Sequence, residues 1–325
     1  LSRNILVQGD AASEVAGFGG HLMFMGDSRA LLYGVEFYRM GQRARVGRYP
    51  VHWHMMGDGS RGAFLVNSSV HHSFNRCVTV HGSHGVLVRD TVAYQTAGHC
   101  FFLEDGAERD NRFENNLGLS TYAPPEGSAL LPSDRGFPGP ATYWITNPDN
   151  DFVGNVAAGS AGTGFWIALP QHPTGLSSDL SLWLRYLPLG AFHSNVAHSN
   201  GSDGLHLDRG PKADPSAGLE VAYYRPSADP SAVDERGRNT SSTLTARIED
   251  FRAYKNRNRG VWLRGEDHLL AGAVLADNAI GATFASHASR AVDSLFVGES
   301  ANLGTPARWE AEQGRTGPGG RALPR

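Results

Sequence analysis

Apolar and non-apolar residues alternate with period two in three short stretches of the first third of the chain: 51–54, 78–81 and 101–104. Such alternation is typical of a β-strand with one buried face and one outward face. His54, His81 and Glu104 occupy the same position in these three copies, 27 and 23 residues apart. Steps of this length suit one coil of a parallel β-solenoid, in which equivalent side chains stack on neighbouring coils.

The same template recurs farther along the chain, and a second type of strand that begins at Asn or Asp lies between its copies. The first type comprises 20–25, 142–146, 164–168, 204–208, 260–264 and 281–285, and the second begins at Asn67, Asp90, Asn116, Asn155, Asn195 and Asp250. Most later copies of the first type begin with a glycine, which we expect to supply the unusual backbone angles of a corner. We expect the Asn or Asp that begins the second type to form hydrogen bonds within its turn. The two interleaved patterns predict an all-β fold: a right-handed, single-stranded parallel β-helix of about nine coils.

Three segments interrupt the repeat and are rich in Pro, Gly and Ser: 120–139, 169–190 and 209–245. Long loops on a rigid scaffold are usually functional or disordered, and we expect these three to wall a groove. The β-helix domain is predicted to span 1–312. Residues 313–325 have almost no apolar content and are expected to form a disordered tail.

Positions predicted to face inward are all apolar: Val51, Trp53, Val78, Val80, Phe101, Leu103, Phe165, Ile167, Leu205, Leu207, Val261 and Leu263. The outward positions form two rows. One contains His52, Thr79, Phe102, Trp144, Trp166, His206 and Trp262, and the other His54, His81, Glu104, Thr146, Ala168, Asp208 and Arg264. Aromatic residues beside histidines and carboxylates are unusual on a solvated face and are typical of a sugar-binding groove. The alternative is that the long loops cover these rings as a second core.

Composition narrows the functional classes. The net charge of −3 over 325 residues gives no general attraction to nucleic acid, and no apolar run approaches the length that spans a membrane. The chain opens on a segment that reads as a strand within a domain, so we expect it to be part of something longer, and we expect it to be a monomer.

Cys77 and Cys100 are predicted to be neighbours on consecutive coils. The spacing between coils is within the range that a disulfide permits. Because in-register parallel neighbours make strained bridges, we favour two stacked, buried thiols.

Three segments, 47–54, 75–82 and 98–106, resemble the β-helix region of the family that contains the cell-migration-inducing hyaluronan-binding protein, transmembrane protein 2 and the fibrocystin-like proteins. The resemblance is specific from about 19 to 118 and architectural beyond that. It implies an extracellular or cell-surface setting and, for the first two relatives, binding and depolymerisation of hyaluronan with a calcium requirement. The fibrocystin-like branch implies a non-catalytic alternative.

Metal binding is the first candidate chemistry. His54, His81 and Glu104 lie on neighbouring coils and need only lean together to share one ion, with His99, His84 and Asp58 as nearby replacements. Two histidines and a carboxylate suit zinc or another transition metal better than calcium, which prefers oxygen ligands. A calcium ion would more naturally use the acidic turn formed by Glu104, Asp105, Glu108 and Asp110, which is otherwise a solvated loop.

Cleavage of a polysaccharide can follow two routes. Glu104 and Asp208 are three coils apart, too far for a hydrolytic carboxylate pair, so hydrolysis needs a closer carboxylate or a metal-activated water. A lyase would instead use Arg48, Arg76 or Arg264 to neutralise a uronate, and His54, His81 or His84 as the base. Each arginine could equally brace a turn.

We therefore predict an endo-acting, extracellular enzyme that depolymerises hyaluronan or another uronic-acid glycan, possessing a divalent-metal site at His54, His81 and Glu104. The alternatives are a glycan-binding or adhesion module and a polysaccharide lyase. The predicted catalytic residues are His54, His81, Glu104, Asp105, Arg48 and His99. The predicted substrate-binding residues are His52, Phe102, Trp144, Trp166, His206, Asp208, Trp262, Arg264 and Arg76.

Overall fold

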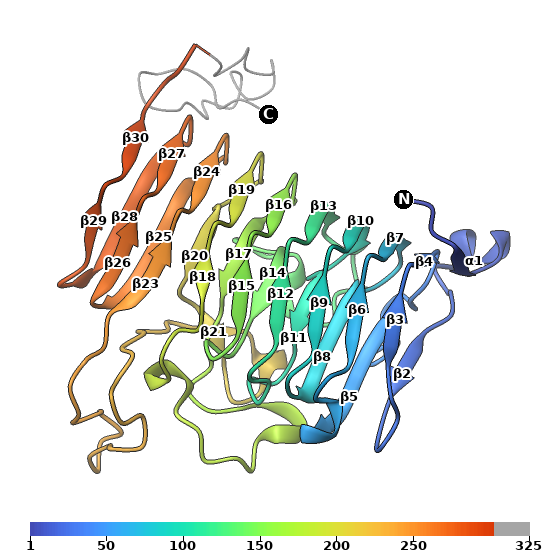
Figure 1. Ribbon diagram of the computed structural model, residues 1–325, viewed down its shortest axis with the longest axis horizontal. Coiled ribbons are helices and arrows are strands. Elements are labelled where there is room, and N and C mark those ends of the chain that lie inside the picture. The colour runs from blue at the N-terminus through green and yellow to red at the C-terminus, as the bar shows by residue number, and fades with distance from the viewer. Residues whose placement is uncertain (302–325) are drawn as a thin grey trace.

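The computed structural model describes residues 1–301, which wind into an elongated stack of parallel β-strands (Figure 1). Three parallel sheets run along the stack and contain nine, ten and nine strands. Each of the nine coils within the described residues contributes one strand to every sheet, and β1 precedes the first coil. The predicted parallel β-helix is confirmed. The predicted tail, 313–325, lies outside the described residues.

The first sheet carries the template that the sequence predicted. Its strands are β2 (Leu22–Phe24), β5 (Val51–Gly57), β8 (Val78–Ser83), β11 (Phe101–Leu103), β14 (Ala141–Ile145), β17 (Thr163–Ile167), β20 (Leu205–Leu207), β25 (Arg259–Glu266) and β28 (Ile280–His287).

The second sheet contains the strands that follow Asn or Asp corners. They are β1 (Ile5–Gln8), β4 (Val35–Tyr38), β7 (Ser69–Ser73), β10 (Val92–Ala97), β13 (Leu117–Tyr122), β16 (Val156–Ala158), β19 (Val196–His198), β24 (Arg252–Tyr254), β27 (Val274–Ala276) and β30 (Leu295–Val297).

The third sheet closes each coil. It comprises β3 (Leu31–Tyr33), β6 (Phe64–Val66), β9 (Leu87–Arg89), β12 (Arg112–Glu114), β15 (Asp151–Val153), β18 (Phe192–His193), β23 (Ala246–Glu249), β26 (His268–Ala271) and β29 (Arg290–Val292). One short helix, α1 (Ala11–Ala16), lies near the amino-terminal end of the stack (Figure 1). None of the helices in residues 1–301 is long and apolar enough to cross a membrane.

The core fills the inside of the coils. All twelve residues predicted to face inward are at most 1% exposed. Aromatic rings of successive coils stack: Phe101 on Tyr143 at 4.7 Å and Tyr143 on Phe165 at 4.5 Å between ring centroids. Because every coil repeats the same inward positions, burial of these rings holds each coil against the next.

Buried asparagines form ladders at a corner. The side-chain oxygen of Asn155 accepts hydrogen bonds from the backbone and side-chain N–H groups of Asn116, and the oxygen of Asn195 accepts the same pair from Asn155. These bonds satisfy polar groups that water cannot reach. The corner glycines differ from our expectation, since Gly204 does not need a left-handed backbone. A Cβ atom there would lie 2.6 Å from the carbonyl oxygen of Gly260, so close stacking of coils requires the glycine.

The two cysteines are bonded to each other, which differs from the predicted pair of free thiols. Cys77 and Cys100 form a disulfide between the third and fourth coils, with their Cα atoms 4.7 Å apart. The prediction of free thiols is wrong, because neighbouring coils hold the two Cα atoms within the range that a disulfide permits.

Three long loops depart from the coils. The first loop, 123–140, includes η2 (Pro132–Asp134) and leads from β13 to β14. The second loop, 168–191, includes η3 (Gly175–Ser177) and η4 (Leu184–Tyr186) and follows β17. The third loop, 208–245, includes β21 (Gly210–Pro211), β22 (Leu219–Glu220) and η5 (Pro215–Ala217) and follows β20. In Figure 1 the second and third loops both extend from the lower side of the stack.

The loops close most of the outward aromatic row. Phe102, Trp144 and Trp166 are at most 2% exposed and form a second hydrophobic cluster with two alanines, against which Leu131 of the first loop and Leu219 of the third loop pack. The predicted open aromatic groove is therefore wrong at these positions, and the alternative of a second core is correct. Burying apolar rings under the loops is energetically favourable, and the outward pattern alone does not reveal the cover.

Candidate functional site

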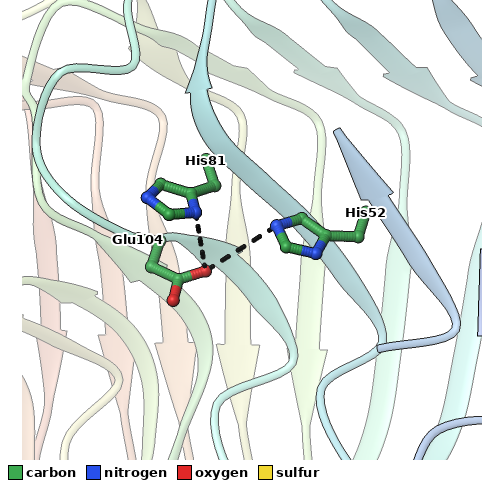
Figure 2. A group of neighbouring side chains, drawn as sticks. All are labelled: His52, His81 and Glu104. Carbon is green, nitrogen blue, oxygen red and sulfur yellow. Dashed lines mark ion pairs between the residues drawn. The ribbon is translucent and has the colours of Figure 1, made fainter. Parts of the chain in front are cut away.

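Three side chains from successive coils converge on one point next to the loops. His52 lies on β5, His81 on β8, and Glu104 directly after β11, and Figure 2 shows them facing one another. Glu104 Oε2 is 3.6 Å from His81 Nδ1 and 3.9 Å from His52 Nε2. One ligand atom from each residue lies within 4.8 Å of the other two, which is the geometry of a candidate metal centre.

This cluster replaces the one predicted from sequence, because His52 takes the place of His54. The register is as expected: His54 pairs with His81 on the neighbouring strand. The imidazole of His81, however, stacks on that of His52, with an interplanar angle of 6°. His54 meets His81 edge-on and lies outside the cluster. The pairing of strands determines which residues are neighbours, whereas side-chain rotamers determine which atoms meet.

Hydrogen bonds on the far side of each imidazole fix where its lone pair points. His52 Nδ1 lies 3.1 Å from the carbonyl oxygen of Gly47, which can only accept, so Nδ1 carries the proton and Nε2 faces Glu104. His81 Nε2 lies 2.7 Å from Asp105 Oδ2, which leaves Nδ1 facing Glu104. His52 Nε2, His81 Nδ1 and Glu104 Oε2 are buried without a hydrogen-bond partner. Buried ligand atoms that converge on one point without hydrogen-bond partners suit a cation, and outer hydrogen bonds of this kind orient metal-binding histidines.

Electrostatics at the site follow from burial. Burial raises the pKa of Glu104 to about 7, although the charge of His81 opposes the rise. Burial also lowers the pKa of His52 to about 3, which keeps this imidazole neutral at pH 7. For His81 burial acts in the same direction, but the hydrogen bond to Asp105 and the charge of Glu104 outweigh it and raise the pKa to about 9. Without an ion a proton therefore occupies His81 Nδ1, and a metal would have to displace it.

The acidic turn after β11 holds the site together through hydrogen bonds. Asp105 Oδ2 accepts hydrogen bonds from His81 and from the backbone N–H of Ser177 in the second loop. The Glu108 carboxylate accepts three backbone N–H groups, those of Gly82, Asp105 and Gly106. Asp110 pairs with Arg61 instead. These partners engage Asp105 Oδ2, both oxygens of Glu108 and Asp110 Oδ2 in protein contacts, and calcium binding at this turn stays a prediction.

A cavity of about 150 Å³ opens beside Glu104. All three loops contribute to its wall, through Leu131, Thr174 and Pro211, and Asp105 lines it as well. Tyr49, which the sequence reading did not single out, also lines the cavity, and its hydroxyl donates a hydrogen bond to Glu104 Oε1 at 3.4 Å. Burial raises the pKa of Tyr49 well above its ordinary value, so the hydroxyl keeps its proton. Tyr49 lies two residues before β5, and this position is the feature of the sequence that could have indicated its role.

Comparison with known proteins places this site in a family. A family model described as CEMIP beta-helix matches residues 17–205, more than half of the chain. The chain belongs to the CEMIP β-helix family.

The most similar relatives agree with the resemblance seen in the sequence. The human protein named Cell surface hyaluronidase CEMIP2 is 39% identical, over 94% of this chain and 26% of that protein. The human Cell migration-inducing and hyaluronan-binding protein is 38% identical over the same shares of the two chains. Mouse Fibrocystin-L is 39% identical over 53% of this chain and 4% of its own length. The chain thus spans about a quarter of the first two relatives.

In this CEMIP β-helix, two other predicted catalytic residues lie away from the cluster. Arg48 is exposed, and its guanidinium contacts His21 at 2.9 Å. His99 is fully buried: Nδ1 accepts the backbone N–H of Ala141, and Nε2 bonds to the hydroxyl of Ser133. Both nitrogens of His99 are used in anchoring the first loop, and burial lowers its pKa to about 3. The structure therefore gives His99 a bracing position and not a catalytic one.

The predicted substrate-binding arginine Arg76 is also a brace. It is 1% exposed, forms a two-pronged ion pair with Asp134 of the first loop, and stacks over Phe102. Arg76 also lines the cavity beside Glu104, where its charge is already paired with Asp134. Its contact with substrate stays a prediction.

Four further predicted substrate residues form a network farther along the first sheet. His206 Nδ1 bonds to Asp203 at 2.7 Å, whereas Asp208 Oδ2 accepts hydrogen bonds from the indole of Trp262 and from Arg264. Asp208 is 3% exposed, and His206 equally so. Only Trp262 and Arg264 of the predicted substrate-binding set retain partial exposure. The aromatic row thus remains accessible at one position.

Proposed function

We propose that this chain is the catalytic β-helix of a cell-surface or secreted enzyme that depolymerises hyaluronan or a closely related uronic-acid polysaccharide. The observation that supports the proposal most strongly is the convergence of three buried side-chain atoms that have no hydrogen-bond partner within residues 1–301, beside a loop-walled cavity. The printed names of two relatives, which refer to hyaluronidase and to hyaluronan binding, give the substrate class. Because the chain covers about a quarter of those relatives, the activity of the whole protein is part of the proposal.

The proposed ligands of a divalent transition metal are His52, His81 and Glu104. Two imidazoles and one carboxylate are the protein ligands of many catalytic zinc sites, which keep a fourth position open. Such an ion, when bound, supplies a Lewis acid and an activated water. The set does not fit the calcium that the family resemblance implied, since nitrogen ligands suit softer ions.

The remaining residues of the site orient the proposed metal ligands and exclude bulk water from them. Asp105 holds the proton on His81 Nε2, and the carbonyl of Gly47 holds the proton on His52 Nδ1. His52 therefore presents the lone pair of Nε2, and His81 would present that of Nδ1 once its second proton is displaced. Tyr49 holds its proton toward Glu104 Oε1 and leaves Oε2 free for the cluster. The cavity is smaller than the roughly 300–1,000 Å³ of typical ligand pockets, so it admits a substituent or one edge of a sugar, with the loops excluding bulk water.

The first prediction separates His52 from His54. We expect His52→Ala to lose bound metal and to lose depolymerisation of size-defined hyaluronan, because one of three ligands is removed. His54→Ala is the matched control on the same strand and should keep both. Elemental analysis of the purified protein measures the metal, and the absorption spectrum of the cobalt(II) form gives a readout that does not depend on activity. Equal metal content in the two variants would refute the assignment.

Two other functions have distinct outcomes in the same assay. Hyaluronan of unchanged length, with or without chelator, would favour a glycan-binding module, as the similarity to Fibrocystin-L suggests. Growth of the ultraviolet absorbance of an unsaturated uronide would identify a lyase, in which a base removes the proton next to the carboxylate. New reducing ends without that absorbance would identify a hydrolase.

A further inference from the structure

A second and larger cavity, of about 490 Å³, lies between the second and third loops. Its volume is within the range of small-molecule sites. Three aromatic residues line it, Trp183, Tyr186 and Tyr223, together with four arginines, Arg185, Arg225, Arg236 and Arg238. Glu266 is the one carboxylate in the lining. None of these residues belongs to the candidate site above.

The arginines leave hydrogen-bond donors for an anion. Arg185 pairs with Glu220, and Arg225 is held by Glu266 and by several oxygens of the third loop. Arg238 pairs with Asp234 on one edge of its guanidinium and is 68% exposed. Arg236 is exposed as well, and its guanidinium has no partner among the contacts of residues 1–301. Arg236 and the outer edge of Arg238 are therefore placed to bind a carboxylate.

The aromatic rings are held in place by contacts across the two loops. Tyr186 of the second loop donates a hydrogen bond to the carbonyl of Gly237 in the third, at 2.8 Å. Gly237 also lies against the ring of Trp183, since a Cβ atom there would be 2.9 Å from it. Trp183 is partly exposed and packs edge-on against His172, and Tyr223 is 38% exposed. Flat rings that keep some exposed surface beside arginines suit a sugar that carries a negative charge.

The second loop connects this cavity to the candidate metal centre. Near its start, Thr174 and Ser177 donate backbone hydrogen bonds to Asp105, the residue that orients His81. A few residues later, Trp183, Arg185 and Tyr186 line the larger cavity. Both loops extend from the same side of the stack (Figure 1). The second loop therefore borders both places.

We propose that the cavity between the second and third loops is a binding subsite for one uronate unit of an acidic polysaccharide. Arg236 and Arg238 pair with the carboxylate, and Trp183 and Tyr223 contact the face of the sugar. The choice of a uronic-acid polymer rests on the proposed function. The site itself needs only a sugar-bearing anion, and it would increase affinity for long chains over short ones, because two linked contacts bind more tightly than one.

The test compares two double variants that remove the same charge. Arg236→Ala with Arg238→Ala alters the subsite. Arg252→Ala with Arg112→Ala is the control. Arg252 is exposed on β24 and has no side-chain partner within residues 1–301, and Arg112 is exposed on β12 beside Glu114, so the pair mimics Arg236 and Arg238 at a distance. Titration calorimetry with size-defined hyaluronan oligosaccharides, at two salt concentrations, measures the affinity.

We expect the subsite variant to bind about tenfold more weakly, equivalent to about 1.4 kcal/mol, and to lose part of the salt dependence. The control should stay within about twofold of the unaltered protein, and Trp183→Ala should weaken binding by a similar factor at either salt concentration. Equal affinities of the two double variants, or no binding by the unaltered protein, would overturn the proposal. His81→Ala should bind normally, so loss of cleavage with retained binding would point to the metal centre and not to this subsite.

Discussion

Two regions of the first sheet share one register and differ in what their outward side chains meet. His52 on β5, His81 on β8 and Glu104 directly after β11 point outward, and their facing polar atoms are buried beside a cavity without a hydrogen-bond partner within residues 1–301. At β14 and β17 the outward residues are Trp144 and Trp166, which the loops cover completely. The difference teaches that outward direction on a β-helix does not mean access, since the loops decide whether an outward side chain becomes core or site.

Removing a ring from the covered region should have the largest effect on stability. Trp166 is fully buried, and its indole donates a hydrogen bond to the carbonyl of Asp208. We expect Trp166→Ala to lower the free energy of unfolding by about 3–5 kcal/mol. Trp262→Ala, two coils later in the same row and partly exposed, should cost less than about 2 kcal/mol. Denaturant unfolding followed by circular dichroism measures both, and equal losses would show that the cover is not tight.

The next prediction concerns the outer support of the cluster. Asp105→Asn keeps the shape of the side chain but removes the charge that faces His81 Nε2. We expect metal affinity to fall by about 10–100-fold, as for other outer-sphere partners of histidine ligands. Asp110→Asn is the control, since Asp110 lies in the same acidic segment but pairs with Arg61. Competition with a chelator gives the affinities, and an unchanged affinity in Asp105→Asn would remove Asp105 from the support of the site.

The smallest predicted effect is the acid sensitivity of the covered region. Asp134 accepts hydrogen bonds from Arg76 and from the backbone of Leu130 and Leu131, and despite its burial these contacts lower its pKa to about 2. A lowered folded-state pKa means that the stabilisation is fully present above the unfolded pKa near 3.8 and is lost as the pH falls toward 2. The pair should thus contribute about 2 kcal/mol at neutral pH through this linkage.

This linkage can be isolated with Asp134→Asn. The difference in unfolding free energy between the unaltered protein and the variant should shrink by about 2 kcal/mol between pH 5 and pH 2, because only the unaltered protein has the titrating carboxyl. Other carboxyls titrate equally in both proteins and cancel. A difference that stays constant with pH would mean that Asp134 does not titrate in this window.

Much of the fold could be predicted because every coil of the repeat carries the same pattern of apolar and polar positions. Each coil repeats the inward apolar positions, so errors at one position do not change the register, and Val51, Phe165 and Val261 all face the core as expected. The candidate site was predicted in part: His81, Glu104 and Asp105 were identified, whereas His54 was chosen in place of His52 and Tyr49 was missed. Arg76 and His99 were also predicted to act at the site. Arg76 pairs with Asp134 and His99 bonds to Ser133, and these contacts with the first loop cannot be read from sequence position.

The sequence by itself determined the coil, its register and the neighbours along each row, because alternation with period two and a repeat of about one coil are local and cumulative signals. The tertiary structure alone decided which rings the loops bury, which way His81 leans, and that the second and third loops enclose a cavity lined with arginines. These outcomes depend on contacts between residues far apart in the chain and on side-chain rotamers, and neither leaves a periodic trace in the sequence.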